Sequence, residues 1–149
     1  MMKQLYLGNS GVNPPLHTIY LYLSNNKPQH VQNDVVTLDN KRIERIKKLA
    51  RIAALPDNWN GNGAKAFSGS LIHKARELLW ELVFVPEVFP TAEGALQFEY
   101  DKLDKSHLEI EIFEDVAEVY MIDKKGKETE TNITPDAESI NKVVAAFYE

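Results

Sequence analysis

The sequence predicts an α+β fold in which an antiparallel β-meander of three to five strands packs, as one of two layers, against about three α-helices. Between residues 40 and 84, apolar side chains recur every three or four positions, as they do on the buried side of a helix. From Pro86 onward they alternate with polar residues, which is typical of strands with one buried face. A helical repeat returns after Thr134, and this order of elements favours an α+β domain.

Size and composition indicate one globular domain inside the cell. The chain has 149 residues, enough for a single hydrophobic core, and contains no cysteine. The lack of cysteine excludes disulfides, thiolate metal sites and cysteine nucleophiles, and agrees with a reducing cytoplasm. No stretch approaches the roughly 20 apolar residues that a membrane span requires. We therefore expect a cytoplasmic protein that does not associate with membranes.

Charge is divided unevenly along the chain. Residues 93–149 hold 15 acidic and 6 basic side chains, whereas residues 1–92 hold 11 basic and 7 acidic ones. An acidic C-terminal part repels nucleic acids and anionic membranes, and attracts a basic protein partner. Alternatively, the acidic surface only keeps the protein in solution. The charge pattern thus favours a protein partner over a nucleic acid.

Residues 1–39 are expected to form an N-terminal arm with one strand, and residues 40–149 a single α+β domain. The arm is rich in Gly, Pro and Asn, which interrupt regular structure. Its predicted strand, residues 17–23, places Ile19, Leu21 and Leu23 on one face and Thr18, Tyr20 and Tyr22 on the other. A further short extended piece is predicted around Val31 and Val35. We expect the arm to pack against its own domain or against a second copy, which would make the protein a homo-oligomer.

The first predicted helix begins at Asp39 or Asn40, either of which can cap it, and runs to about Ala54 before Pro56. Its expected buried stripe consists of Ile43, Ile46, Ala50 and Ala53. The opposite face is basic and holds Lys41, Arg45, Lys47, Lys48 and Arg51. Such a face can contact phosphates, but a solvated helix face is the commoner outcome, so the pattern does not favour nucleic-acid binding.

A loop and a second helix follow. Residues 55–64 are dense in types that tolerate positive φ, and we expect Trp59 to anchor this loop. The second helix is predicted from Ser68 or Ser70 to Phe84. Its expected core positions are Leu71, Ala75, Leu78, Leu79 and Leu82. Trp80 lies on another face, where it would suggest a partner surface if exposed, or would be covered by the arm.

The strands are predicted over residues 96–101, 108–112 and 116–122, with a fourth ending near Ile133. Thr134 is expected to cap the last helix, with Pro135 in its first position. The side chains expected to face inward from this helix are Ile140, Val143, Val144 and Phe147.

Four short motifs carry a resemblance to known proteins: WNGNGA at 59–64, PTAEG at 90–94, FEY at 98–100 and LEIE at 108–111. The pattern resembles a group of small uncharacterised bacterial and phage-associated proteins. They share W-x-G-x-G-A, P-T-x-x-G, an acidic–aromatic pair and an L-x-I-x strand. The resemblance covers about residues 46–123, and Tyr100 stands where those proteins more often have Trp. It implies a shared fold and surface, with structural loop roles for Gly61, Gly63, Pro90 and Gly94, but no reaction.

Carboxylates form the one group of residues with catalytic potential. Glu99, Glu109, Glu111 and Glu118 are expected on neighbouring strands of one polar face. Together with His107 they would bind a divalent metal or act as general acid and base. The commoner alternative is that this face is simply solvated. In a third alternative, Glu99 is buried and accepts hydrogen bonds from the amides of the glycine loop.

Two functions follow from these patterns. The first is a non-enzymatic cytoplasmic protein-interaction module of the antitoxin, immunity or phage-accessory kind. It needs no cofactor, and its candidate contacts are Trp59, Trp80, Glu99, Glu109 and Glu111. The alternative is a metal-dependent hydrolase that uses Glu99, Glu109 and Glu111, with His107 as a further ligand. Carboxylates converging in a concave pocket would favour the enzyme, whereas a flat acidic face would favour binding.

Overall fold

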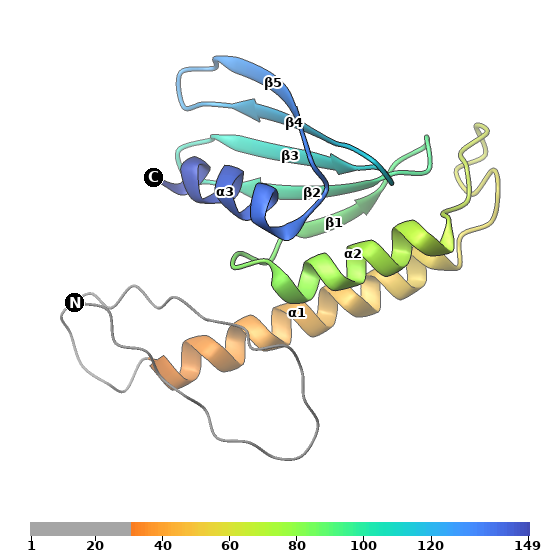
Figure 1. Cartoon of the computed structure of the whole chain (residues 1–149), viewed down its shortest axis with the longest axis horizontal. Coiled ribbons are helices and arrows are strands. Elements are labelled where there is room, and N and C mark those ends of the chain that lie inside the picture. The colour runs from red at the N-terminus through yellow and green to blue at the C-terminus, as the bar shows by residue number, and fades with distance from the viewer. Residues whose placement is uncertain (1–30) are drawn as a thin grey trace.

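The structure, a computed structural model, describes the backbone of residues 31–149 and the side chains from Asp39 onward. The predicted strand at 17–23 therefore lies outside the described residues. From Val31 to the last residue, three helices and five strands follow one another (Figure 1). They are α1 (Val31–Ala53), α2 (Gly69–Glu81), β1 (Glu87–Pro90), β2 (Leu96–Asp101), β3 (His107–Ile112), β4 (Ala117–Ile122), β5 (Glu128–Ile133) and α3 (Ala137–Tyr148). The predicted α+β class is confirmed.

The five strands form one antiparallel sheet in the order β1-β2-β3-β4-β5, so each strand pairs with its neighbour in sequence. The register aligns Val88 with Phe98, Phe98 with Ile110, and Ile110 with Val119. Because side chains alternate between the two faces of a strand, this register gathers the apolar residues on one face. The predicted meander is therefore confirmed.

The core lies between the apolar face of the sheet and the helices. Helix α2 contributes Leu71, Ala75, Leu78 and Leu79, all buried as predicted. Helix α3 contributes Ile140, Val144 and Phe147, with Val143 partly buried beside them. Figure 1 shows α3 lying across the sheet, with α1 and α2 side by side below β1. Within residues 31–149, the helices thus lie on one side of the sheet, and no helix covers the other face.

Helix α1 differs from its prediction in two ways. It begins at Val31 and not at Asp39 or Asn40, so the residues around Val31 and Val35 are helical and not extended. Its buried residues are Leu49 and Ile52, with Ile46 partly buried, whereas the expected stripe residues Ile43, Ala50 and Ala53 are exposed. The buried face continues toward the N-terminus through Arg42 and Arg45, which a search for apolar residues does not detect.

Three further boundaries also differ. Helix α2 ends at Glu81 and not at Phe84, because Leu82 adopts an extended backbone with ψ of 132°. Helix α3 begins at Ala137, where the Asp136 side chain accepts a hydrogen bond from the Ser139 amide at 2.8 Å. Asp136 is therefore the N-cap, and Thr134 and Pro135 precede the helix. Strand β1, which ends at Pro90, had no separate prediction.

Candidate functional site

The open face of the sheet is acidic. Glu99 on β2 lies directly opposite Glu109 on β3, and Glu111 on β3 lies directly opposite Glu118 on β4. The predicted gathering of these residues on neighbouring strands is confirmed. Among the described strand residues, none on this face is Lys or Arg. We call this surface the acidic face and define it by Glu99, Glu109, Glu111, Glu118, Glu128 and Glu130.

Opposed carboxylates work against the stability of the sheet. Like charges directly opposite each other on paired strands destabilise the pairing. Glu99 is partly compensated because Gln97 Nε2 donates to its Oε1 at 2.7 Å. The pair formed by Glu111 and Glu118 receives no hydrogen bond of this kind among the described contacts. The sheet therefore carries a cluster of negative charges on the face that does not contribute to the hydrophobic core.

His107 is held between two carboxylates at the end of the acidic face. Its Nδ1 lies 2.7 Å from Asp101 Oδ1, and its Nε2 lies 2.8 Å from Glu109 Oε1. Only the protonated imidazole carries a hydrogen on both nitrogens, so this geometry favours the charged ring. Burial lowers the pKa of His107, but the hydrogen bonds and charges of Asp101 and Glu109 outweigh it and raise the pKa above its ordinary value.

The acidic face holds a partly enclosed hollow and no described metal site. The hollow has a volume of about 260 Å³ and opens between β2 and β5. It is lined by Gln97, Glu109, Glu111, Glu118, Val119, Tyr120, Glu130, Thr131 and Asn132. Within residues 39–149, no three His, Asp or Glu side chains are placed to hold a metal ion. The set Glu99, Glu109, Glu111 and His107 therefore lies on one face without forming a ligand cluster, and the hydrolase alternative gains no support.

The WNGNGA loop is closed by Asn58, the residue just before it, and not by Glu99. Asn58 adopts a positive φ of 61°, its Oδ1 accepts from the Gly63 amide at 2.7 Å, and its carbonyl oxygen accepts from the Gly61 amide at 2.9 Å. The expectation that Glu99 satisfies these amides is therefore wrong. Trp59 is partly buried, and its Nε1 donates to the Lys65 carbonyl at 3.2 Å, which ties the two ends of the loop together.

The PTAEG turn packs directly against this loop. Pro90 ends β1, and Gly94 turns the chain with φ of +86° and donates to the Thr91 carbonyl at 3.2 Å. The Lys65 amide donates to the Ala92 carbonyl at 3.0 Å. The two glycine motifs thus form one structural unit, although neither motif by itself predicts this contact.

The two tryptophans lie away from the acidic face. Trp80 is 45% exposed and belongs to α2, on the helical side of the sheet. Val83 and Phe84 after the helix are also exposed, and Phe84 stacks on Tyr148 with ring centroids 4.7 Å apart. The structure therefore brings Glu99, Glu109 and Glu111 together but places the candidates Trp59 and Trp80 elsewhere.

The basic face of α1 is only partly free. Arg45 donates to the Pro86 carbonyl at 3.0 Å and pairs with Glu87, while Lys48 Nζ lies 3.8 Å from the centre of the Phe89 ring. Lys41, Lys47 and Arg51 are exposed. Since two of the five expected residues hold α1 to β1, phosphate binding by this face loses support.

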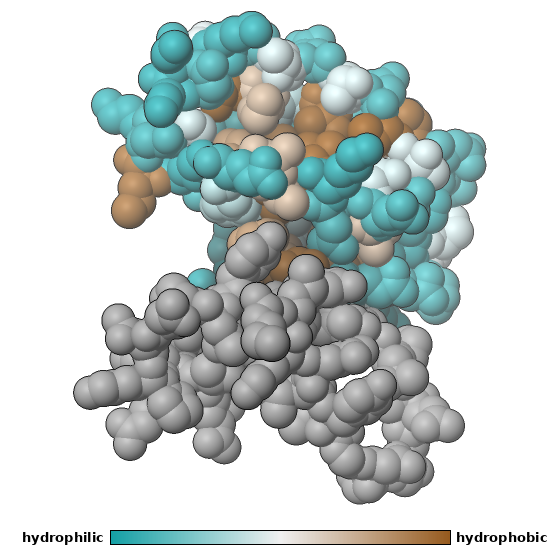
Figure 2. Space-filling view, turned by 60° about the vertical axis from the view of Figure 1, so that its left-hand side comes forward, coloured by the Kyte–Doolittle hydropathy of each residue, from teal (hydrophilic) through white to brown (hydrophobic). Residues whose placement is uncertain are grey.

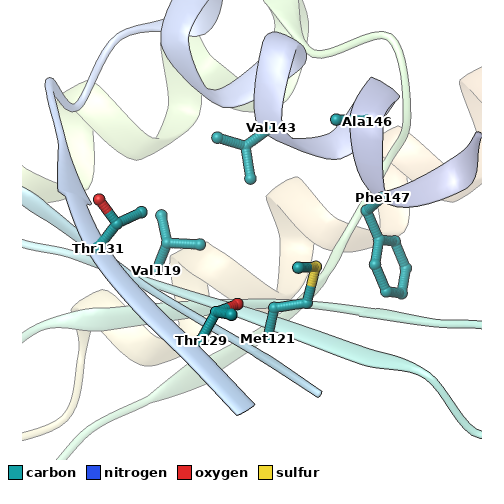
Figure 3. A pocket seen from close by; sticks show the side chains of 7 residues that line it. All are labelled: Val119, Met121, Thr129, Thr131, Val143, Ala146 and Phe147. Carbon is teal, nitrogen blue, oxygen red and sulfur yellow. The ribbon is translucent and has the colours of Figure 1, made fainter. Parts of the chain in front are cut away.

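A second hollow was not foreseen from the sequence. It has a volume of about 190 Å³ and lies between α3 and strands β4 and β5 (Figure 3). We call it the α3 groove and define it by Val119, Met121, Thr129, Thr131, Val143, Ala146 and Phe147. Figure 2 shows that the upper part of the described domain exposes an area of hydrophobic residues with hydrophilic residues around it. The sequence signal for the groove is weak, because Val143 and Phe147 fit an ordinary core pattern.

No protein-family model, curated protein or solved structure matches this chain significantly. The resemblance of the four motifs to small bacterial and phage-associated proteins therefore stays a prediction. Within the described part of the chain, no helix combines the length and the apolar composition needed to cross a bilayer.

Proposed function

We propose that this chain is a small protein-interaction module whose acidic face binds a basic segment of another protein. The observation that carries the proposal is the direct opposition of Glu99 to Glu109 and of Glu111 to Glu118 on an open sheet face. The fold incurs a cost for these pairs, since like charges face each other. Lys or Arg side chains of a partner would offset that cost with charge-assisted hydrogen bonds.

The shape of the face supports a polypeptide partner over a small substrate. Its hollow is only partly enclosed and extends over four strands, with Tyr120 and Asn132 beside the carboxylates as hydrogen-bonding groups. A small substrate is usually enclosed in a deeper and more apolar pocket. Negative potential over a broad surface also steers basic partners toward it and repels nucleic acids. An extended basic segment lying across the strands fits both features.

The cellular compartment and the biological role are also proposed from the sequence. We place the protein in the cytoplasm, where a chain without cysteine does not depend on an oxidising compartment. A role as an antitoxin, immunity or phage-accessory protein agrees with a small module that acts by binding another protein. The proposal invokes no cofactor and no metal.

Matched charge variants test the proposal. The full chain, the triple variant E99Q/E109Q/E111Q and the control triple variant E81Q/E93Q/E149Q are each used to capture proteins from the native cell, followed by mass spectrometry. Both variants remove three negative charges, but the control residues are exposed and lie outside the sheet. We expect a stoichiometric protein carrying a basic segment with the wild type and the control, and its loss with the first variant.

Two results would contradict the proposal. One is equal capture of the partner by both triple variants, and the other is the absence of any stoichiometric partner from all three samples. A captured partner should also dissociate as salt is raised from about 0.05 to 0.5 M, because screening weakens exposed charge interactions. Circular dichroism of each variant verifies that the substitutions leave the fold intact.

A further inference from the structure

The two edge strands of the sheet, β1 and β5, differ in length and in exposure. Strand β1 is only four residues long, ends at Pro90 and is accompanied by α1, whose Arg45 donates to the Pro86 carbonyl. Strand β5 forms the opposite edge, and five of its six residues are exposed. An edge strand presents a row of backbone N–H and C=O groups that can pair with another strand. Of the two edges, β5 is the one that offers such a row.

The α3 groove lies next to this edge. Val143 and Phe147 of α3 point toward β4 and β5, and Thr129 and Thr131 form the outer wall of the groove (Figure 3). Thr129, Thr131 and Ile133 share the face of β5 that looks toward the groove, while Glu128 and Glu130 share the acidic face. A strand added to β5 would therefore place alternate side chains over an apolar hollow and beside carboxylates.

We propose that residues 18–23 of a second copy of this chain add to β5 as a sixth strand, so that two copies exchange their N-terminal arms. This segment has the alternation that the edge requires. Its aliphatic side chains, Ile19, Leu21 and Leu23, cover the α3 groove. Its other side chains, Thr18, Tyr20 and Tyr22, lie on the face of Glu128 and Glu130.

Charge favours the N-terminal arm over a second β5 strand as the segment that pairs with β5. Glu128 and Glu130 would meet their own counterparts if two β5 strands paired, and like charges oppose such pairing. The arm carries no acidic residue before Asp34, and its charged residues ahead of that position are Lys3 and Lys27. Tyrosine hydroxyls can donate hydrogen bonds to the carboxylates of Glu128 and Glu130 on β5. The arm therefore matches the edge in its side-chain alternation, and the segment at 18–23 adds no negative charge beside Glu128 and Glu130.

Chain length favours a second copy over the same chain. Helix α1, which follows the arm, lies beside β1 at the far end of the sheet from β5. Crossing five strand spacings and the width of a helix requires about 34 Å. The residues between the predicted strand and Val31 span at most about 28 Å when fully extended. An arm therefore reaches the β5 edge of a neighbouring copy more readily than its own.

The first test is the mass of the full chain in solution. Light scattering and sedimentation should give a dimer that dissociates on dilution. The variants Leu21→Asp, in the arm, and Ala146→Arg, in the groove, should each raise the dimer dissociation constant at least about 100-fold, because each removes the contact twice per dimer. Ala145→Arg is the matched control, since Ala145 is also an exposed residue of α3 but does not line the groove. It should leave the dissociation constant within about threefold.

The second test locates the contact by cross-linking. Since the natural chain has no cysteine, a single Leu21→Cys variant and a single, differently tagged Thr131→Cys variant each carry one thiol. A short thiol-specific cross-linker should join the two chains, whereas Leu21→Cys with Lys65→Cys, in the distant glycine loop, should give no product. A monomeric wild type at all concentrations would overturn the proposal. So would a product that forms only within one chain carrying both Leu21→Cys and Thr131→Cys.

Discussion

Arg42 Nε of α1 donates a hydrogen bond to the carbonyl oxygen of Leu79 in α2 at 2.7 Å, and its Nη2 donates to the Leu82 carbonyl at 2.8 Å. These carbonyls belong to the C-terminal turn of α2, where helical carbonyls lack partners within the helix. The cationic side chain also complements the negative end of the helix dipole. Arg42 therefore holds the end of one helix against the side of another.

Replacing Arg42 with Met should lower the free energy of unfolding by about 2–3 kcal/mol, because a charged donor to two partly buried carbonyls is removed while an unbranched apolar stem is kept. Urea denaturation followed by circular dichroism measures this change. The control Lys41→Met alters an exposed neighbour of the same charge and should change stability by less than about 0.5 kcal/mol. Equal midpoints for the two variants would show that the Arg42 hydrogen bonds do not contribute.

Gly94→Ala should destabilise the protein by about 1–3 kcal/mol, since Gly94 has φ of +86° and an added Cβ would lie 3.2 Å from Lys65 Cβ. Gly69→Ala is the control. Gly69 starts α2, an added Cβ there meets nothing within 4 Å, and the change should raise stability by up to about 1 kcal/mol. Thermal unfolding of both variants should give opposite signs, and a stable Gly94→Ala would rule out strain at this turn.

Trp59→Ala should cost about 1–2 kcal/mol, which is less than the loss from a fully buried aromatic, because Trp59 is only partly buried and lies outside the main core cluster. Trp59→Phe keeps a ring but removes the hydrogen bond to the Lys65 carbonyl, and should cost about 0.5–1.5 kcal/mol. Chemical denaturation compares both with the wild type. An unchanged midpoint for Trp59→Ala would favour a partner-contact role for this residue.

His107 should make stability depend on pH. Because its folded pKa is raised, the native state binds the proton more tightly than the unfolded state does. Its stabilising contribution is fully present below the ordinary pKa of about 6.5 and is lost as pH rises through the higher folded value. The difference in unfolding free energy between wild type and His107→Gln should therefore shrink as pH increases from about 5.5 to 8.5.

An NMR titration of the His107 ring measures its pKa directly. The residues that determine the result are Asp101 and Glu109, which contact the two ring nitrogens. Glu109→Gln should lower the pKa of His107, because a neutral amide replaces a carboxylate 2.8 Å from Nε2. Glu118→Gln, on the same face but without a contact to the ring, serves as the control. A wild-type pKa at or below 6.5 would contradict the ion-pair geometry.

Much of the fold could be predicted because the strands alternate so regularly. In β2 and β3, Phe98 and Ile110 are buried while Glu99 and Glu109 point to the open face, and a shift of one residue would reverse every position. The alternation therefore predicts both the buried face and the grouping of the carboxylates. The alternation does not predict the hollow on the acidic face, which only the structure shows.

Other features depend on contacts between distant residues and could not be predicted. The buried face of α1 includes Arg42 and Arg45, whose charges are accommodated by carbonyl groups roughly 40 positions later in the chain. Periodicity of apolar residues alone therefore selected Ile43 and Ala50, which are exposed. Likewise, the alternative in which Glu99 accepts from the glycine-loop amides fails because Asn58, a local residue with positive φ, accepts from the amides of Gly61 and Gly63. A search for periodic apolar residues does not detect polar side chains that have structural roles.

Because α1 lies beside β1, the sheet is more easily extended by a further strand at β5 than at β1. Strand addition at β5 extends it by one element, and the far edge offers only a short strand that ends at Pro90 beside a helix. In the proposed exchange each copy uses its one arm and its one β5 edge, so neither remains for a third copy. An assembly built in this way closes at a fixed stoichiometry, which separates it from the open-ended stacking that leads to fibres.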